Sequence, residues 1–158
     1  MSLKQRSGFY SVVCAVILFN FFIGIVSYRL GGKPQLYNFL ALPSFAPTAG
    51  LLVLLWGSVY TLSGITFSAS LFCGKRSIAA ILYVLLSALT FAWYPLFFGA
   101  GLVFLSLFVS ATIVSVSLFL TQAYFRQSLL IGILHLPCVA WYSYLFVLEF
   151  AIIRMNLV

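Results

Sequence analysis

Three tryptophans are the residues whose type and spacing best suit binding chemistry, because each lies in a different apolar segment. Trp56 lies about six residues into its segment and Trp141 about midway along its own. Aromatic anchors of membrane proteins gather at the interfaces instead. The sequence leaves two interpretations open, an interfacial belt and an interior pocket. A pocket walled by indole rings would bind a flat, apolar, conjugated ligand by stacking.

His135 and Glu149 are the other titratable candidates for a functional role, and both lie in the last apolar segment together with Cys138. His135 and Cys138 are three residues apart, so a haem or metal pair is one interpretation. A hydrogen-bonded packing role for His135, beside a bend at Pro137, is the favoured one, because a metal needs further ligands. We therefore expect no metal site. Glu149 is expected to extend to the membrane interface.

No conventional catalytic set occurs in the sequence. It contains no Ser/His/Asp combination, no carboxylate pair, no Gly-rich phosphate loop and no H-E-x-x-H motif. Hydrolytic and phosphoryl-transfer chemistry are excluded on this ground.

The composition defines the class of protein in which these residues must be positioned. Of 158 residues, 65% are hydrophobic and 6% are charged, with a net charge of +7. Soluble domains are about 45–50% apolar and about 25% charged. So few charges could not cover the surface of a soluble globule, which excludes a cytosolic enzyme, a disordered chain and a nucleic-acid binder. The net charge of +7 is also no nucleic-acid footprint, because the basic residues are scattered and form no patch. The remaining class is a multi-pass membrane protein.

Five apolar segments of about 20 residues or more predict five transmembrane helices. They cover about residues 8–28, 50–72, 77–98, 102–121 and 128–154, with a polar break at 122–127. Continuous apolar character, without alternation, argues against a β-barrel. We expect an all-α integral membrane bundle forming a single domain over residues 1–158. The first segment is interpreted as a retained helix, because it is longer than the apolar region of a signal peptide.

The connection between the first two segments, residues 29–50, is long for a compact protein. It is rich in Gly and Pro, yet carries apolar residues such as Tyr37, Leu40 and Phe45. Two interpretations are open: a folded lid over the end of the bundle, and an interfacial segment among lipid headgroups.

Small residues recur on one face of the second and of the fourth segment. These faces contain Gly57, Thr61, Gly64 and Ser68, and Ser106, Ser110, Ser117 and Thr121. Small-residue faces allow close helix packing in lipid. They predict either packing inside one bundle or a homodimer.

Three blocks of the sequence resemble a known family. Residues 36–60 read L-Y-N-F-L-A-L-P-S-F-A-P-T-A-G-L-L-V-L-L-W-G-S-V-Y. Residues 90–99 read T-F-A-W-Y-P-L-F-F-G, and residues 137–156 read P-C-V-A-W-Y-S-Y-L-F-V-L-E-F-A-I-I-R-M-N. In order and internal spacing they resemble the signatures of the TspO family, the tryptophan-rich sensory proteins, also called translocator protein or peripheral-type benzodiazepine receptor.

The resemblance implies a five-helix bundle whose pocket is capped by the first loop. Members of the TspO family bind protoporphyrin IX, haem, isoquinoline and benzodiazepine drugs and, in some cases, cholesterol. Ligand-binding positions carried over, with neighbours from the lid and the aromatic stripes, are Tyr37, Pro43, Phe45, Pro47, Trp56, Tyr60, Thr90, Trp93, Phe97, Trp141 and Leu148. Thr90 and Glu149 both stand where the family has Asn.

The expected function is therefore a membrane receptor or sensor for tetrapyrroles and related flat ligands, with no obligatory cofactor. Its partners would be those small molecules and the lipid bilayer, with no nucleic acid. Two alternatives follow from the same resemblance: light- or oxidant-dependent porphyrin breakdown, using Trp56 and Trp141 as redox-active indoles, and lipid or sterol transport. The resemblance implies a bacterial cytoplasmic membrane or a mitochondrial outer membrane as the location.

Overall fold

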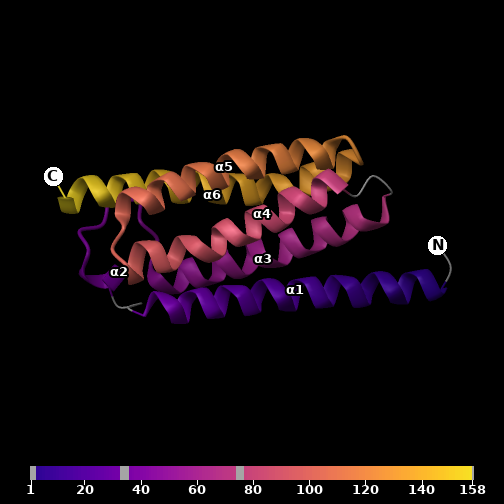
Figure 1. Cartoon of the computed structure of the whole chain (residues 1–158), viewed down its shortest axis with the longest axis horizontal. Helices are drawn as coiled ribbons and strands as arrows, with labels where there is room; N and C mark the ends of the chain where they lie inside the picture. The colour runs from indigo at the N-terminus through magenta and orange to yellow at the C-terminus, as the bar shows by residue number, and fades with distance from the viewer. Residues whose placement is uncertain (1–2, 33–35, 74–76, 158) are drawn as a thin grey trace.

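The computed structural model is a bundle of long antiparallel helices (Figure 1). It describes the chain except residues 1–2, 33–35, 74–76 and 158. The side chains of residues 1–6, 33–36, 38, 74–77 and 157–158 are also outside the description. In chain order the elements are α1 (Leu3–Gly31), α2 (Leu36–Phe39), α3 (Ala49–Phe72), α4 (Ser77–Tyr94), η1 (Pro95–Gly99), α5 (Val103–Phe125) and α6 (Leu129–Leu157).

Five stretches of the described helices are long and apolar enough to cross a membrane. They are Ser7–Gly31, Ala49–Phe72, Ile78–Gly99, Val103–Phe125 and Leu129–Asn156. The predicted all-α integral membrane bundle is confirmed, and the two termini lie at opposite ends of it (Figure 1). The predicted polar break at 122–127 is too long, because α5 remains helical through Phe125.

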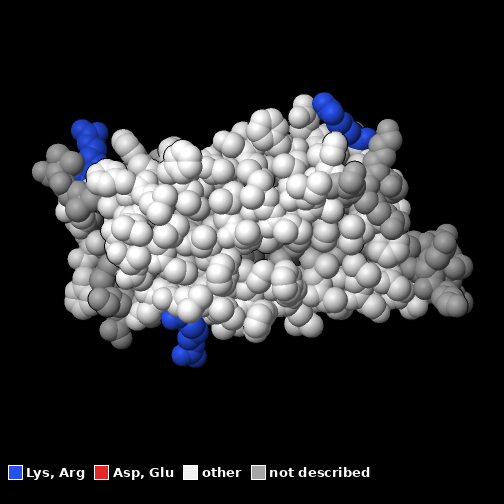
Figure 2. All heavy atoms as spheres, viewed as in Figure 1, with Lys and Arg blue, Asp and Glu red and all other residues white. Residues whose placement is uncertain are grey.

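The surface suits a lipid environment. Large apolar side chains cover it, among them Leu18, Val53 and Phe104. In Figure 2 basic side chains appear at the upper left end, at the upper right and on the lower edge left of centre, and no acidic side chain is visible on that face. The broad middle of this face is uncharged, which is the pattern expected of a bundle that spans hydrocarbon.

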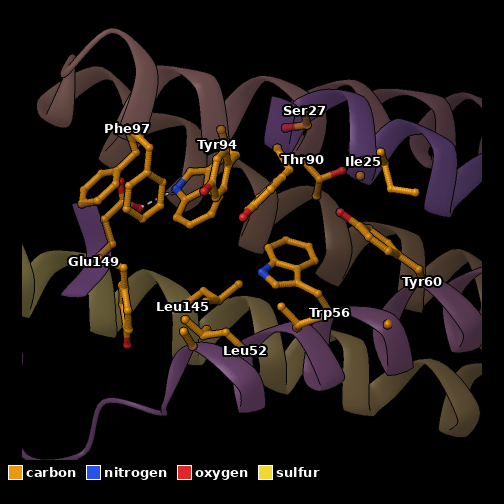
Figure 3. Close-up of a pocket in the computed structure, with 18 of the residues that line it drawn as sticks. Ile25, Ser27, Leu52, Trp56, Tyr60, Thr90, Tyr94, Phe97, Leu145 and Glu149 are labelled. Carbon is orange, nitrogen blue, oxygen red and sulfur yellow. Dashed lines mark hydrogen bonds between the residues drawn. The ribbon is translucent and has the colours of Figure 1, made fainter. Parts of the chain in front are cut away.

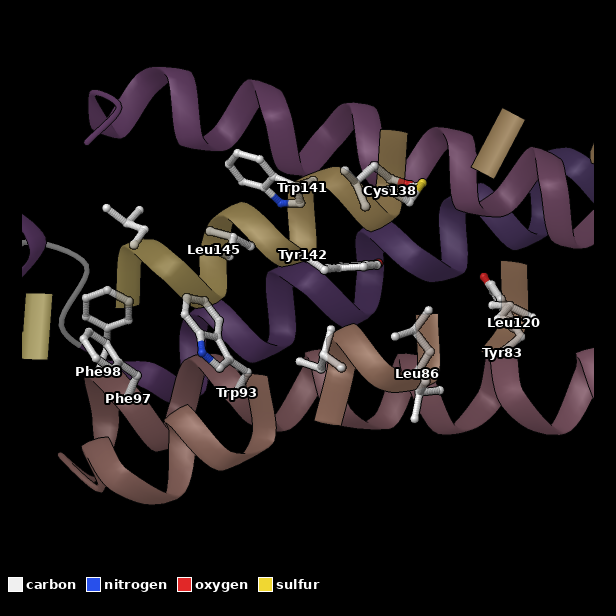
Figure 4. Close-up of a cluster of buried hydrophobic side chains, with 14 of the residues drawn as sticks. Tyr83, Leu86, Trp93, Phe97, Phe98, Leu120, Cys138, Trp141, Tyr142 and Leu145 are labelled. Carbon is white, nitrogen blue, oxygen red and sulfur yellow. Dashed lines mark hydrogen bonds between the residues drawn. The ribbon is translucent and has the colours of Figure 1, made fainter. Parts of the chain in front are cut away.

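Buried aromatic and aliphatic side chains hold α3, α4, α5 and α6 together (Figure 4). Phe67 of α3 stacks on Tyr83 of α4, with ring centroids 3.8 Å apart. The Tyr83 hydroxyl donates to Asn20 Oδ1 at 2.6 Å, and Asn20 Nδ2 donates to the Tyr60 carbonyl at 3.0 Å. This relay ties α1 to two other helices through a buried polar group in the apolar interior.

The predicted small-residue faces are used inside the bundle. All four residues of the α5 face are buried: Ser106, Ser110, Ser117 and Thr121. The hydroxyl of each lies within hydrogen-bond distance of a backbone carbonyl of α5 itself. On α3, Gly64 is buried against Ile17 of α1. The packing interpretation therefore accounts for these faces, and the homodimer stays a prediction that they do not require.

Pro95 explains the wide helical turn η1 and a contact with α1. Proline lacks an N–H and its ring displaces the carbonyl four residues earlier, which here belongs to Phe91. That carbonyl accepts a 2.7 Å hydrogen bond from Ser27 Oγ of α1. The turn ends at Gly99, and Gly101 follows with φ +67°, a left-handed conformation that glycine adopts without strain. Pro137, by contrast, lies inside the uninterrupted helix α6.

Candidate functional site

A cavity of about 380 Å³ lies between α1, α3, α4, η1 and α6, in the half of the bundle that carries α2 in Figure 1. Figure 3 shows side chains that line it. This volume lies within the range of about 300–1,000 Å³ that is common for small-molecule sites. Its wall is mostly apolar and aromatic. The residues that line it include Gly24, Ile25, Tyr37, Val53, Trp56, Tyr60, Thr90, Trp93, Phe97, Leu148 and Glu149.

Two indole rings form the aromatic wall. Trp56 of α3 and Trp93 of α4 have ring centroids 6.1 Å apart, with an angle of 35° between their planes. Tyr60 lies 5.3 Å from Trp56, and Phe97 stacks on Trp93 at 6.1 Å and 13°. These rings pack on one another at separations where aromatic contacts are favourable, and all four line the cavity, so a flat ligand in it would meet an aromatic wall.

The third tryptophan does not line the cavity. Trp141 of α6 is buried behind Trp56, with ring centroids 6.1 Å apart and planes at 86°. Its indole N–H has no hydrogen-bond partner among the described residues. Trp141 thus supports the ring of Trp56 edge-on, one turn of α6 away from the cavity residue Leu145.

Glu149 is the polar group at one end of the cavity, beside Phe97 (Figure 3). The expectation that it extends to the interface is wrong, because its side chain is only 2% exposed. The indole N–H of Trp93 donates to Oε2 at 2.9 Å, and Ser106 Oγ lies 2.6 Å from Oε1. Donors on two other helices thus hold this carboxyl group inside the bundle.

The cavity opens sideways between α1 and α3. Ile25 and Val53 line it, yet they are 59% and 70% exposed on the outer surface. The outer surface of these spans faces lipid in a membrane. On the same side, the Tyr60 ring lies over Gly24, where an added Cβ would be 2.5 Å from the ring. Glycine at position 24 leaves the space that this ring occupies.

The connection before α3 folds over the end of the bundle and is tied to α6. Asn156 makes two hydrogen bonds of 2.9 Å with the backbone of Ala41, one to its N–H and one to its carbonyl. The Tyr144 hydroxyl donates to the carbonyl of Phe45 at 2.9 Å. These bonds favour the lid interpretation over a segment that lies loosely among headgroups.

Tyr37 connects this lid to the cavity. It is buried, lines the cavity and donates its hydroxyl to the Pro47 carbonyl at 2.8 Å. A tyrosine hydroxyl is protonated at neutral pH, and burial raises the pKa of Tyr37 further, so this hydroxyl keeps donating. Pro43, Phe45 and Pro47 shape the lid but do not themselves line the cavity.

Replacing Asn156 with alanine is expected to loosen the lid. The change removes both hydrogen bonds to Ala41, and each such bond contributes about 0.5–1.5 kcal/mol. Amide hydrogen exchange at residues 40–46 should become roughly tenfold faster, while exchange in α5 stays unchanged. Binding of protoporphyrin IX should slow exchange in the unmodified lid. Equal exchange in both proteins, with and without that ligand, would contradict the assignment of a lid.

His135 and Cys138 lie outside the cavity, deeper in the bundle. His135 Nδ1 is 3.3 Å from Thr66 Oγ1, and the His135 ring contacts Tyr124 edge-on. Cys138 is buried against α3, and its Sγ lies 3.9 Å from the Val59 carbonyl. The described residues contain no group of three or more potential metal ligands. The favoured interpretation, a packed and hydrogen-bonded His135, agrees with these contacts.

The structure thus brings together most of the residues that the sequence singled out. Those that line the cavity are Tyr37, Trp56, Tyr60, Thr90, Trp93, Phe97 and Leu148, whereas Pro43, Phe45, Pro47 and Trp141 lie around it. Sequence reasoning missed the contribution of α1, which includes Gly24, Ser27 and Tyr28. It also missed Glu149 as a wall residue, although an acidic residue in an apolar segment was a usable signal.

The fold and the cavity define a class: a multi-pass integral membrane protein with five described spanning helices, four of which line an aromatic pocket beneath a lid. Within that class the chain belongs to the TspO/MBR family, whose model matches residues 12–155. Membership supports a membrane receptor or sensor role in broad terms. No curated protein matches the chain.

Proposed function

We propose that this protein is a membrane receptor or sensor that binds tetrapyrroles, such as protoporphyrin IX, and related flat apolar ligands. One observation carries the proposal: Trp56 and Trp93 face the same apolar cavity at membrane depth, beneath a hydrogen-bonded lid. A flat conjugated macrocycle is apolar and suits a cavity with an apolar wall. It also gains stacking interactions with both indole rings.

The lateral opening supports the same proposal. Porphyrins and isoquinoline- or benzodiazepine-type molecules partition into lipid, and the cavity opens between two spanning helices at Ile25 and Val53. A ligand dissolved in the bilayer would reach the indole rings without crossing the lid. Haem would bind in the same way as the iron-free porphyrin, since His135 lies outside the cavity.

Titration of the purified protein in lipid nanodiscs with protoporphyrin IX tests the proposal. We expect saturable quenching of tryptophan fluorescence with one porphyrin per chain. The His135→Ala variant serves as a control, and it should bind haem and protoporphyrin IX with the same small change in affinity. A sample of protein-free nanodiscs with dissolved tryptophan shows how quenching depends on porphyrin concentration without a binding site. If quenching of the protein rises linearly with porphyrin concentration, as in that sample, the proposal is wrong.

A further inference from the structure

Glu149 is the only acidic side chain in a sequence that carries eight basic ones. It is 2% exposed and lines the cavity, and none of the described residues offers it a cation within salt-bridge distance. A carboxyl group buried in a membrane helix is costly and usually pairs with another charged or hydrogen-bonding group. The neighbours Trp93 and Ser106 supply hydrogen bonds but no positive charge.

The hydrogen bonds around Glu149 are compatible with both protonation states. Ser106 has one hydroxyl proton, yet its Oγ lies 2.6 Å from Glu149 Oε1 and 2.9 Å from the Val103 carbonyl. If Ser106 donates to Glu149, the carboxylate form is satisfied. If Ser106 donates to Val103, a protonated Glu149 can donate to Ser106 Oγ. The carboxyl group can thus keep or release a proton without breaking the network.

The two bonds also leave acceptor capacity on the carboxyl group. A carboxylate has about four acceptor sites on its two oxygens. Trp93 and Ser106 each make a short hydrogen bond to one oxygen of Glu149, and the Ser110 hydroxyl is a further polar neighbour. Glu149 lines the cavity but is only 2% exposed, so a shift of its side chain toward the cavity would present the remaining sites to an N–H group of a ligand.

We propose that the pocket selects planar ligands that carry a basic nitrogen and places that nitrogen against Glu149. The inference rests on the proposed function of the pocket and adds the chemical class of the ligand. A neutral amine would take the proton from Glu149, or an ammonium ion would meet the carboxylate. In either case the bound pair has no net charge, which lowers the cost of burying it in the membrane.

The same geometry disfavours an anionic group at this end of the pocket. The described lining includes no Lys, Arg or His, so a ligand carboxylate beside Glu149 would lack a counter-ion. The propionate groups of a porphyrin would have to lie away from Glu149. Because the protein as a whole carries +7, its general field attracts anions, and a preference for cations would report on the local site.

Three pyrene probes of nearly equal size separate these effects: 1-pyrenemethylamine, 1-pyrenemethanol and 1-pyrenecarboxylate. Binding is measured by energy transfer from tryptophan to pyrene in phosphatidylcholine nanodiscs, corrected for partition into protein-free nanodiscs. A hydrogen bond in which donor or acceptor is ionised is roughly twice as strong as a neutral one. We therefore expect the amine to bind at least roughly tenfold more tightly than the alcohol. The carboxylate should bind more weakly than the alcohol.

The Glu149→Gln variant provides the matched change. Its amide oxygen can accept from Trp93 and its amide nitrogen can donate to Ser106, so the buried network is kept. The advantage of the amine over the alcohol should disappear, and saturable binding of pyrenemethanol by the variant verifies that the pocket is folded. The Ser117→Ala variant changes a buried hydroxyl elsewhere on α5 and should keep the order of the three probes.

The outcomes distinguish the two proposals. If Trp56→Leu weakens all three probes but wild type binds them equally, the pocket assignment stands and the basic-nitrogen inference is wrong. If Glu149→Gln keeps the preference for the amine, the inference is also wrong. If Trp56→Leu changes the binding of none of the probes, the proposed function itself fails. The wild-type comparison alone decides the inference if Glu149→Gln does not fold.

Discussion

Replacing Trp56 with leucine should weaken the binding of protoporphyrin IX by about tenfold. Trp56 lines the cavity and lies against both Trp93 and Tyr60, so its loss removes a stacking surface from the centre of the wall. An aromatic contact contributes about 0.5–1.5 kcal/mol beyond the buried area, and the lost area adds to this. Fluorescence titration of both proteins in nanodiscs measures the difference.

Trp141→Leu is the matched control for this experiment. The change is chemically identical, but Trp141 lies outside the cavity wall and contacts Trp56 edge-on. We expect a smaller loss of affinity, about threefold or less, together with some loss of thermal stability from the buried ring. If Trp141→Leu weakened binding more than Trp56→Leu, or if neither change had an effect, the pocket would be assigned wrongly.

Replacing Gly64 with alanine should destabilise the bundle. The new Cβ would lie 2.7 Å from Ile17 Cγ1 and 3.3 Å from the backbone of α1, so α1 and α3 must move apart. Overpacking of this kind costs about 1–3 kcal/mol. The thermal unfolding midpoint in detergent should fall by several degrees, and ligand affinity should fall with it because both helices form the cavity wall.

Gly57→Ala is the control on the same face of α3. Its Cβ would meet only the Phe21 ring at 3.7 Å, an ordinary van der Waals contact. Both substitutions gain the same helix propensity, about 1 kcal/mol, so their difference isolates the contact between α1 and α3. Equal unfolding midpoints for the two variants would show that α1 does not pack closely at Gly64.

The spanning helices could be predicted from the sequence because lipid forces each apolar segment to satisfy its own backbone. The side of α1 that faces the cavity could not be predicted from the sequence. That helix is apolar on every face, so no stripe distinguished Gly24 or Ser27 from lipid-facing residues. The inward position of Ser27 depends on Pro95 in a distant segment, because this proline frees the Phe91 carbonyl that accepts the Ser27 hydrogen bond.

Glu149 shows the limit of reasoning from position along one helix. It is seven residues before Asn156, close enough to the helix end for an extended side chain to reach the interface. The partners that hold it inside, Trp93 and Ser106, belong to α4 and α5. Trp141 shows the converse: its spacing predicted a place on the pocket face, but the neighbouring Trp56 ring fills that place.

Because the cavity opens sideways at Ile25 and Val53, the ligand concentration that determines binding is the concentration within the bilayer. A ligand that arrives through this opening is counted per lipid molecule rather than per litre of water. Acyl chains occupy the same opening and compete with it. An apparent dissociation constant expressed in total ligand should therefore rise in proportion to the lipid added to a fixed amount of protein. Affinities measured in different detergents or nanodiscs become comparable only as mole fractions in the bilayer.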